Sequence, residues 1–337
     1  MNNAIVNHGL KILAIIGALI FTEACQKNDQ GVNPTPSGSL TGLVRSAKTG
    51  LPIGGVNIST QPATSTAISD SLGLYSFPQL SPGTYQVIIA TAYWDTVRQT
   101  VSIVSSIAAT VNASLKATIP TGQLSLYLPF SGNTSDSSGE GQITSRHNVA
   151  LVADRFGIPA SASGFTGDSC YLSFPNGGIS GHTKLTIGLW FKTTSGGLIL
   201  GSQSSELYTW PPAAYVPNIE VGTDGKLYAY LWNGTLPPMK TTFAVNDGVW
   251  HFAALVGDET FQTLYVDGEL ISQISGTISD SHSPFNQFGT GNTGVRNGAG
   301  WPGGNDEWFQ YVGKLDDVRI YDRALSAQEC AQLFHER

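Results

Sequence analysis

The sequence contains few charged residues. Lys, Arg, Asp and Glu make up 12% of its 337 residues, and the formal net charge is -7. A typical soluble domain has roughly a quarter of its residues charged. Proteins that bind nucleic acids need clustered Lys and Arg side chains to displace counterions from phosphates, and no basic stripe occurs here. The composition therefore argues against nucleic acid as a partner.

The apolar run at residues 12–21 is too short to cross a bilayer. It has about ten residues, whereas a spanning helix needs about 20. This length is typical of the core of a signal peptide, and Lys11 precedes it. Residues 22–25, Thr-Glu-Ala-Cys, follow and resemble a bacterial lipobox, in which Cys25 becomes the lipidated first residue of the mature protein. The alternative is an ordinary secretory signal with an incidental cysteine.

A polar segment with two prolines, Pro34 and Pro36, follows Cys25 and has the composition of a tether. Together with a start rich in Asn and Lys, it resembles the surface lipoproteins of the Bacteroidetes. We therefore predict a lipoprotein signal peptide at 1–24 and a flexible tether at 25–38. The resemblance implies an exported protein that is lipid-anchored to the outer membrane through Cys25 and exposed at the cell surface.

Cysteine is also scarce, with three residues in the chain. If Cys25 is acylated, Cys170 and Cys330 remain, which permits one disulfide in an exported protein. The alternative is two buried apolar residues. Cys330 shares a face with Leu333 and Phe334 in a helical pattern at 326–334. Nothing in the spacing of the cysteines indicates a metal cluster or a redox pair.

A chain of 337 residues is too long for one ordinary core, so we expect two domains. The first, at 39–117, consists of short segments with period-two alternation, separated by Gly and Pro turns. Such spacing predicts a small β-sandwich. The domain contains no His and hence no zinc-ligand constellation.

Four segments of this domain carry a family resemblance. They are the opening 41–44, the Thr-Gly-Leu-Pro-Ile-Gly-Gly-Val run at 49–56, the Asp-Ser-Leu-Gly-Leu-Tyr turn at 70–75, and Leu-Ser-Pro-Gly-Thr-Tyr at 80–85. In this order they resemble the carboxypeptidase regulatory-like (prealbumin-like) domain. The resemblance implies a fold and a role as spacer or scaffold, and does not imply peptidase activity.

The second domain, at 121–337, also reads as alternating strands, followed by a short helix with Ser326 and Glu329 placed as a capping box. Its sequence contains a Phe-x-Gly loop at 130–132, Asp-Arg-Phe-Gly at 154–157, Tyr-Val-Asp-Gly at 265–268, and a closing strand at 315–326. These motifs resemble the laminin G-like, concanavalin A-like lectin/glucanase domains. The resemblance implies a jelly-roll sandwich of two curved antiparallel sheets and a role in binding or adhesion. We therefore predict an all-β protein of two sandwiches with a short C-terminal helix.

Catalysis is not expected. Glucan hydrolases with this fold carry acidic residues alternating on one concave strand, because retaining cleavage needs two carboxyls about 5 Å apart. The strand best placed to hold them, 227–232, has no acid. His251 lies in a strand with no nucleophile motif nearby, so we interpret it as structural.

The resemblance also implies a structural calcium ion near the sandwich edge. Calcium prefers several oxygen ligands. Asp136, in a Ser/Gly-rich loop, and Asp316 are the candidate ligands, with Asp317 as the alternative to Asp316, since strand neighbours face opposite ways. The other interpretation is that these acids cap turns or pair with Arg319 or Arg323.

Aromatic residues are the strongest lead to a ligand. Tyr228, Tyr230 and Trp232 recur at every second position and so share one sheet face, where stacked rings suit the apolar faces of sugars. Core packing is the alternative. A Gly-rich loop at 292–308 and an aromatic loop that includes Tyr208 and Tyr215 are further candidates. The predicted ligand-binding residues are Tyr228, Tyr230, Trp232, Trp210, Trp301 and Trp308.

The favoured function is non-catalytic binding of a glycan or surface polysaccharide by the second domain. The first alternative is a protein-adhesion or purely structural module, and the second is an atypical glycoside hydrolase. A row of exposed aromatic rings on the concave sheet would favour glycan binding. A flat apolar patch would favour a protein partner, and a facing pair of carboxyls in a cleft would favour hydrolysis.

Overall fold

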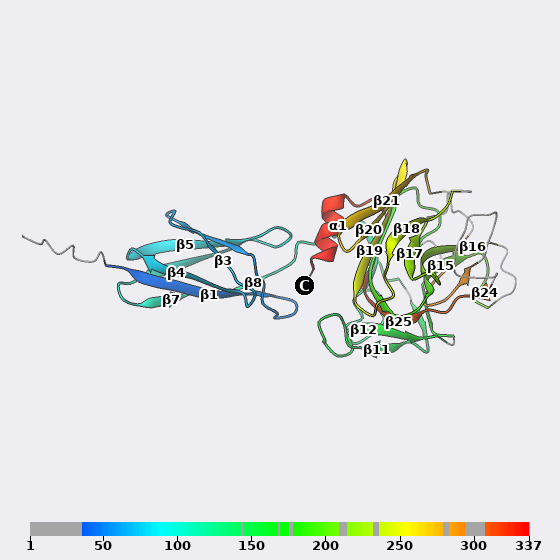
Figure 1. The fold of residues 1–337 in the computed structure, drawn as a ribbon, viewed down its shortest axis with the longest axis horizontal. Coiled ribbons are helices and arrows are strands. Elements are labelled where there is room, and N and C mark those ends of the chain that lie inside the picture. The colour runs from blue at the N-terminus through cyan, green and yellow to red at the C-terminus, as the bar shows by residue number, and fades with distance from the viewer. Residues whose placement is uncertain are drawn as a thin grey trace, which may run out of the picture. The chain divides into compact units, whose positions relative to one another are not determined.

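The protein is described here by a computed structural model (Figure 1). The described residues are 36–142, 144–167, 169–174, 178–208, 214–231, 236–278, 283–293 and 307–336. They form strands throughout, with one short helix near the C-terminus. Two β-sandwiches follow one another along the chain, which confirms the predicted all-β fold class.

The first sandwich contains two four-stranded sheets. In one sheet β1 lies between β4 and β7 and also pairs with β8, and in the other the order is β3, β2, β5, β6. The strands are β1 (Gly38–Ser46), β2 (Asn57–Gln61), β3 (Ala67–Ile68), β4 (Leu74–Leu80), β5 (Gly83–Ala90), β6 (Val97–Ile103), β7 (Ala108–Thr110) and β8 (Ala113–Leu115).

Gly42 in the middle of β1 allows Tyr75 to pack tightly. A Cβ atom at this position would lie 1.9 Å from the carbonyl oxygen of Val111 and 2.5 Å from the ring of Tyr75. The Tyr75 hydroxyl donates to that same carbonyl oxygen at 2.6 Å. A larger residue at position 42 would therefore displace a buried ring and its hydrogen bond.

The second sandwich consists of a seven-stranded sheet, called the front sheet below, and an eight-stranded back sheet. The front sheet runs β10 (Ser145–His147), β13 (Tyr171–Phe174), β22 (Phe285–Phe288), β15 (Gly197–Gln203), β16 (Tyr215–Val221), β17 (Lys226–Ala229) and β18 (Met239–Ala244). The back sheet runs β11 (Ala150–Val152), β12 (Ala162–Thr166), β25 (Val312–Tyr321), β14 (Leu185–Thr193), β19 (His251–Gly257), β20 (Phe261–Val266) and β21 (Glu269–Ser275), with β9 (Leu124–Leu128) paired to β25.

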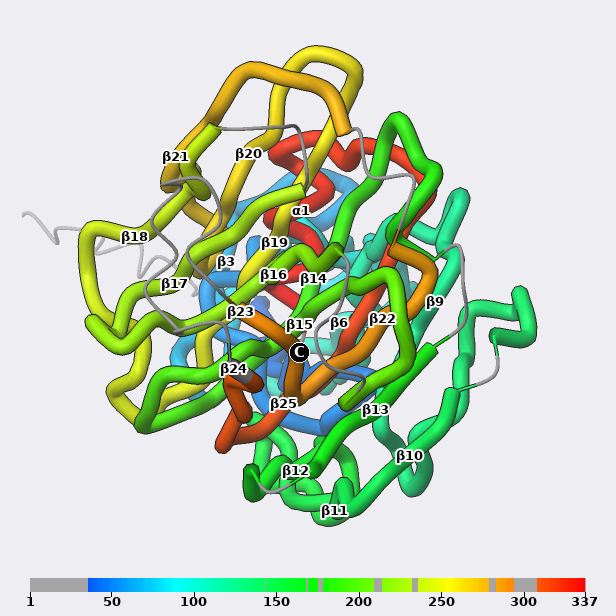
Figure 2. Tube along the Cα trace, turned by 90° about the vertical axis from the view of Figure 1, so that its right-hand side faces the viewer, coloured from blue at the N-terminus to red at the C-terminus, as the bar shows by residue number. Residues whose placement is uncertain are grey.

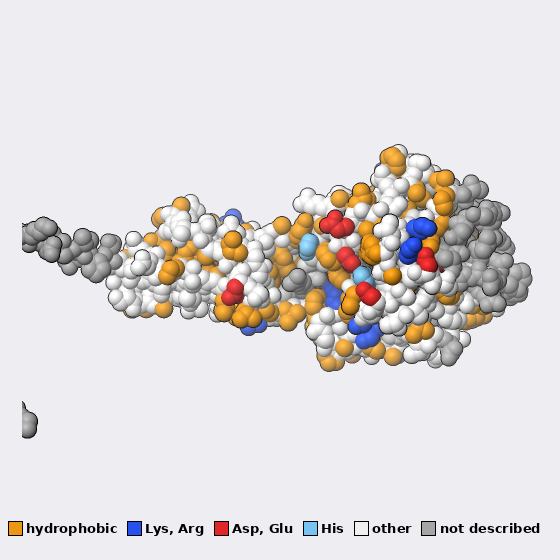
Figure 3. All heavy atoms as spheres, viewed as in Figure 1, with side chains coloured by type: hydrophobic (Ala, Val, Ile, Leu, Met, Phe, Trp, Pro, Cys, Tyr) orange, Lys and Arg blue, Asp and Glu red, His pale blue; other side chains and the backbone are white. Residues whose placement is uncertain are grey.

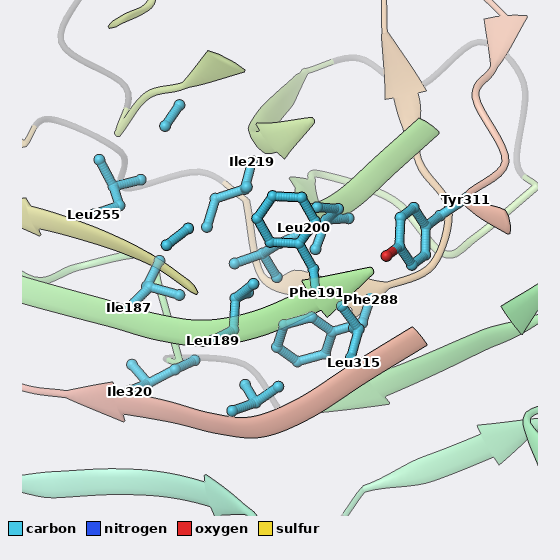
Figure 4. Packing of buried hydrophobic residues seen from close by; sticks show 14 of the residues in the cluster. Ile187, Leu189, Phe191, Leu200, Ile219, Leu255, Phe288, Tyr311, Leu315 and Ile320 are labelled. Carbon is cyan, nitrogen blue, oxygen red and sulfur yellow. The ribbon is translucent and has the colours of Figure 1, made fainter. Parts of the chain in front are cut away.

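The core of this sandwich lies between the two sheets. Ile187, Leu189 and Phe191 alternate along β14 and extend into the layer that contains Leu200 and Ile219 of the front sheet (Figure 4). All five side chains are fully buried. Period-two alternation therefore has the effect expected from the sequence, because each strand directs every second residue into one apolar layer.

The helix α1 (Ala327–Phe334) packs against the opposite face of the back sheet. Its N-cap is Ser326, whose hydroxyl accepts from the backbone N–H of Glu329, while the Glu329 carboxylate accepts from Ser326, so the predicted capping box is confirmed. Cys330 and Leu333 are buried there beside Phe252. Cys170 lies instead in the core between the sheets, and both cysteines are free thiols. The disulfide that the sequence left open is therefore not formed.

Two further features bear on partners. None of the described residues belongs to a helix with the length and apolarity needed to cross a membrane. The face drawn in Figure 3 carries acidic and basic side chains in small, scattered groups. It shows no continuous basic stripe of the kind that a nucleic-acid surface needs.

Replacement of a core leucine tests the packing. Leu315 of β25 is fully buried in the core, so Leu315→Ala should lower the free energy of unfolding by about 2–5 kcal/mol through lost transfer energy and a residual cavity. Chemical denaturation of the full chain measures this loss. Val312→Ala in the same strand is the control, because Val312 is exposed and its truncation should cost under about 0.5 kcal/mol. Equal losses in the two variants would contradict the assigned core.

Candidate ligand-binding site

The front sheet has an outer face that points away from the core, and Figure 2 turns this side of the molecule toward the reader. Leu227, Ala229 and Leu231 lie in the core, so Tyr228 and Tyr230 project from the outer face. The two rings pack with Val216 in a small separate cluster and are only 4% and 2% exposed. The predicted shared face is thus observed for Tyr228 and Tyr230, but these two rings are covered and do not form an open platform.

A groove lies on the outer face at the other end of the same sheet. Its volume is about 410 Å³. Because Leu172 and Phe288 point into the core, their neighbours Tyr171 and Gln287 point outward into the groove. The remaining lining comprises Ser173, Phe174, Glu206, Leu207, Pro284, Phe285 and Asn286. Aromatic, amide and carboxylate groups therefore meet in one depression on the front sheet.

A row of aromatic rings runs beside this groove. Tyr171 stacks on His147 with ring centroids 5.0 Å apart, and it meets Tyr208 in an edge-to-face arrangement with centroids 6.2 Å apart. Tyr208 then contacts Trp308 at 4.9 Å. Tyr208 is 40% exposed and Trp308 is half-buried. The row combines one predicted ligand-binding residue, Trp308, with rings from β10, β13 and the loop after β15.

The other aromatic residues that the sequence analysis named do not belong to this row. Trp210, Trp232 and Trp301 lie outside the described residues. Tyr215, expected in an aromatic loop, is the first residue of β16 and extends the front sheet. Sequence reasoning missed Tyr171 and His147 as site residues, although the outward position of Tyr171 follows from the alternation of Leu172 and Phe174 into the core.

Strand β16 also carries an acid that the sequence analysis did not single out. Glu220 is 0% exposed and lies between the core residues Ile219 and Val221, so it points to the outer face. Burial, with a smaller contribution from the charge of Asp224, raises the pKa of Glu220 to about 8. Neither carboxylate oxygen has a hydrogen-bond partner in the part of the chain that the structure describes. The segment 227–232, in which the sequence analysis looked for acids, overlaps β17, the neighbour of β16.

The candidate calcium ligand Asp136 is used by its own loop. Its Oδ1 accepts from the N–H groups of Tyr127 and Ser138, both at 2.9 Å. Its Oδ2 accepts from the Ser138 hydroxyl at 2.7 Å and from the N–H of Gln142 at 3.0 Å. Partial burial opposes ionisation, but these hydrogen bonds hold the pKa of Asp136 below its usual value. Asp136 thus caps a turn.

Asp316 and Asp317 both form ion pairs with Arg155 in a single network. The Arg155 guanidinium contacts Asp316 Oδ2 with one nitrogen and Asp317 Oδ2 with the other, at 2.7 Å for Asp317. Asp317 has φ 46°, and the pairing of β25 with β14 shifts register at this point. This irregularity explains why neighbouring side chains reach the same partner, which regular alternation would prevent.

The charges of this network follow from burial and pairing. Burial, and then the charge of Asp317, raises the pKa of Asp316 to about 7. Burial alone would also raise the pKa of Asp317, but the positive charges around it, from Arg319 and Arg155, hold that pKa well below its usual value. Tyr127 donates its hydroxyl to Asp317 Oδ1 at 2.9 Å.

These contacts bear on the calcium ion that the sequence predicts near Asp136 and Asp316. The oxygens of Asp136 each accept two hydrogen bonds, and Asp316 faces a guanidinium. Within the described residues no group of three or more His, Cys, Asp or Glu side chains is arranged to hold a metal ion. The residues at this position therefore do not fit calcium.

His251 has the structural role expected for it. Its Nδ1 lies 2.7 Å from Asp267 Oδ2, and its Nε2 lies 3.2 Å from Asp247 Oδ1. The hydrogen bond to Asp267, supported by both negative charges, raises the pKa of His251. Both ring nitrogens are engaged by carboxylates, so neither is free to act as a general base.

Comparison with known proteins supports this fold. Residues 39–116 match the family model of the carboxypeptidase regulatory-like domain. Residues 166–331 match the Laminin_G_3 model, described as the concanavalin A-like lectin/glucanases superfamily. The observed second sandwich begins before this match, because β9 from Leu124 onward pairs with β25. No protein of curated function matches the sequence.

Solved structures resemble the chain at low identity. The binding domain of Paraclostridial Mosquitocidal Protein 1 is 17% identical over 64% of this chain and 52% of that one, with a TM-score of 0.44. The chain thus spans about half the length of that protein.

Domain 4 of a GH43 extracellular arabinanase from Geobacillus stearothermophilus, solved with arabinotriose, is 16% identical over 63% of this chain and 98% of that one, with a TM-score of 0.43. TM-scores below 0.5 support no conclusion about the ligand of this chain. The assignment therefore depends on the family models: residues 39–116 form a carboxypeptidase regulatory-like domain, and residues 166–331 belong to a concanavalin A-like domain.

Proposed function

We propose that the concanavalin A-like domain binds carbohydrate, without catalysis, in the groove on the outer face of the front sheet. The observation that carries this proposal is the aromatic row from His147 through Tyr171 and Tyr208 to Trp308, which borders a groove with polar lining. Sugar rings present apolar faces that stack on aromatic rings, and hydroxyls that need hydrogen-bond partners at their edges.

The groove offers both kinds of contact. Tyr208 and Phe285 are exposed aromatic rings at its border, and Glu206 is an exposed carboxylate beside them. Ser173 adds a half-buried hydroxyl to the lining, which can form a hydrogen bond with a sugar hydroxyl.

The arrangement supports binding better than hydrolysis. Retaining and inverting glycosidases both place two carboxyls at the scissile bond. Glu220 has the raised pKa of a general acid, but it is fully buried, and among the described residues that line the groove Glu206 is the one carboxylate. We therefore propose a binding module, with protein adhesion as the outcome to expect if glycans do not bind.

We further propose that the chain is an exported lipoprotein, anchored to the outer membrane through Cys25 and displayed at the cell surface. The support is the sequence of residues 12–25, with its short apolar run followed by a lipobox-like end. In this arrangement the carboxypeptidase regulatory-like domain serves as a spacer between the anchor and the binding domain.

Glycan binding is tested by an array screen of the full chain, followed by titration calorimetry with the best ligand. Tyr171→Ala and Tyr208→Ala should each weaken binding about tenfold, equivalent to about 1.4 kcal/mol, because each removes a stacking ring. Phe261→Ala is the matched control, since Phe261 is an exposed ring on the back sheet, and its affinity should not change. If the full chain binds no glycan on the array, the proposal of carbohydrate binding is wrong. If glycan affinity is unchanged in both Tyr171→Ala and Tyr208→Ala, the groove is not the binding site.

Lipidation is tested in cells that express the full chain and are labelled with an alkyne-bearing fatty acid. The wild-type protein should take up the label and fractionate with membranes, because acylation of Cys25 supplies the anchor. Cys25→Ser should abolish the label. Cys330→Ser serves as the control and should still be labelled, since Cys330 is buried in the folded domain. An unlabelled wild-type protein released in soluble form would instead indicate an ordinary secretory signal.

A further inference from the structure

Strand β23 (Asn292–Thr293) crosses the outer face of the front sheet and pairs with β24 (Glu307–Trp308). A Cβ atom on Gly291 would lie 2.3 Å from Leu198, so the chain passes directly over that side chain. Leu198 is paired with Glu220 across β15 and β16. Alternation then directs Thr293, two residues beyond Gly291, to the same side as Glu220.

Several buried side-chain atoms of β16 and β23 have no hydrogen-bond partner within the described part of the chain. Alternation directs Asn292, whose Oδ1 and Nδ2 are both unpaired, away from the side of β23 that Thr293 occupies. The set considered below is Oε1 and Oε2 of Glu220, Oδ1 of Asn218 and Oγ1 of Thr293. The orientation of the Asn218 amide is fixed, because its Nδ2 donates to the carbonyl oxygen of Tyr230 at 3.3 Å. All three side chains are at most 1% exposed. Buried polar groups in folded proteins are nearly always paired, so this set calls for a missing partner.

The chemistry of the set indicates which partner is missing. Every unpaired atom in it is an oxygen, and one residue is a carboxylate. No ion pair joins Glu220 to any Lys, Arg or His among the described residues. Asp224 adds negative charge close by. Hard cations such as Ca²⁺ are held by carboxylate, amide and hydroxyl oxygens of this kind.

We propose that Glu220, Asn218 and Thr293 form a site for a hard, oxygen-coordinated cation between β16 and β23. These residues supply four side-chain oxygens, and water or backbone carbonyls complete the six to eight that Ca²⁺ takes. The site is distinct from the position near Asp136 and Asp316, where the carboxylates are already engaged. Its test requires no glycan, so either proposal can fail without the other.

Two competing occupants are less suitable. A sugar ring does not reach these oxygens, because the side chains that carry them are buried. Buried water molecules would pair with the amide and hydroxyl oxygens, but Glu220 would then remain a neutral acid, the form that its raised pKa favours without a cation. A cation instead holds the ionised carboxylate and joins β23 to the sheet. It thereby also fixes β24, which carries Trp308 of the aromatic row.

The first test is titration calorimetry of the full chain, stripped with EDTA and dialysed, with CaCl₂ as the probe. We expect saturable binding at one site that weakens at least tenfold in Glu220→Gln, because the variant keeps the shape but loses the charge. Glu206→Gln is the matched control, since Glu206 is an exposed acid in the groove, and it should bind as the wild type does.

A second variant guards against misfolding of the first. Asn218→Asp adds a carboxylate to the site and should tighten binding, measured as Tb³⁺ luminescence sensitised by the neighbouring tyrosines. Absence of Ca²⁺ and Tb³⁺ binding in the wild type would overturn the proposal and indicate buried water alone. Binding that is unchanged in Glu220→Gln and Asn218→Asp would overturn it equally, by placing the cation elsewhere.

Thermal melting gives a third readout of the cation. Added CaCl₂ should raise the melting temperature of the EDTA-stripped wild type, because a ligand that binds only the folded state stabilises it. Glu220→Gln should show a much smaller rise. If the wild type and Glu220→Gln respond identically to CaCl₂, Glu220 does not hold a cation.

Discussion

The structure of the second domain depends on the close packing of two apolar sheet faces. Side chains alternate along a strand, so one face of the front sheet packs into this core and the other face carries a separate set of side chains. Ile219, Leu227 and Phe288 fill the core, and their sequence neighbours Glu220, Tyr228 and Gln287 consequently appear together on the outer face. The candidate site is therefore a direct product of how the core is built.

The outer face contains two regions of different character. At one end, Tyr171 and Gln287 border an open groove beside the aromatic row. In the middle, the chain at Gly291, just before β23, passes over Leu198, which is the cross-strand partner of the fully buried Glu220. The first region has the surface that a carbohydrate needs, and the second has the enclosed oxygens that a small cation needs. Because β24 carries Trp308 and pairs with β23, a cation in the second region would help to order the first.

The sequence was sufficient to predict the parts of the structure that follow from local patterns. Alternation predicted the strands around Leu189 and Leu227, and the Ser326–Glu329 pair predicted the helix start; all are observed. The calcium prediction at Asp136 and Asp316 did not account for Arg155, which is distant in sequence but contacts Asp316 and Asp317. A register irregularity at Asp317 brings both acids to one partner, and alternation alone does not anticipate it.

The site residues that the sequence analysis missed also depend on the tertiary structure. Tyr215 was expected in an aromatic loop, but Tyr215 and Glu220 both belong to strand β16. Tyr171 and Tyr208 meet only because the fold brings β13 beside the loop after β15. Contacts of this kind depend on strand order, which is a property of the whole sandwich and cannot be inferred from any one segment.

Hydrogen–deuterium exchange of the full chain, with and without a bound glycan, would show where the ligand binds without any substitution. If the glycan binds on the outer face of the front sheet, exchange should slow in peptides that cover β13 (Tyr171–Phe174) and β22 (Phe285–Phe288) and stay unchanged in β19 to β21 of the back sheet. Protection confined to the back sheet or to the carboxypeptidase regulatory-like domain would contradict this location of the site.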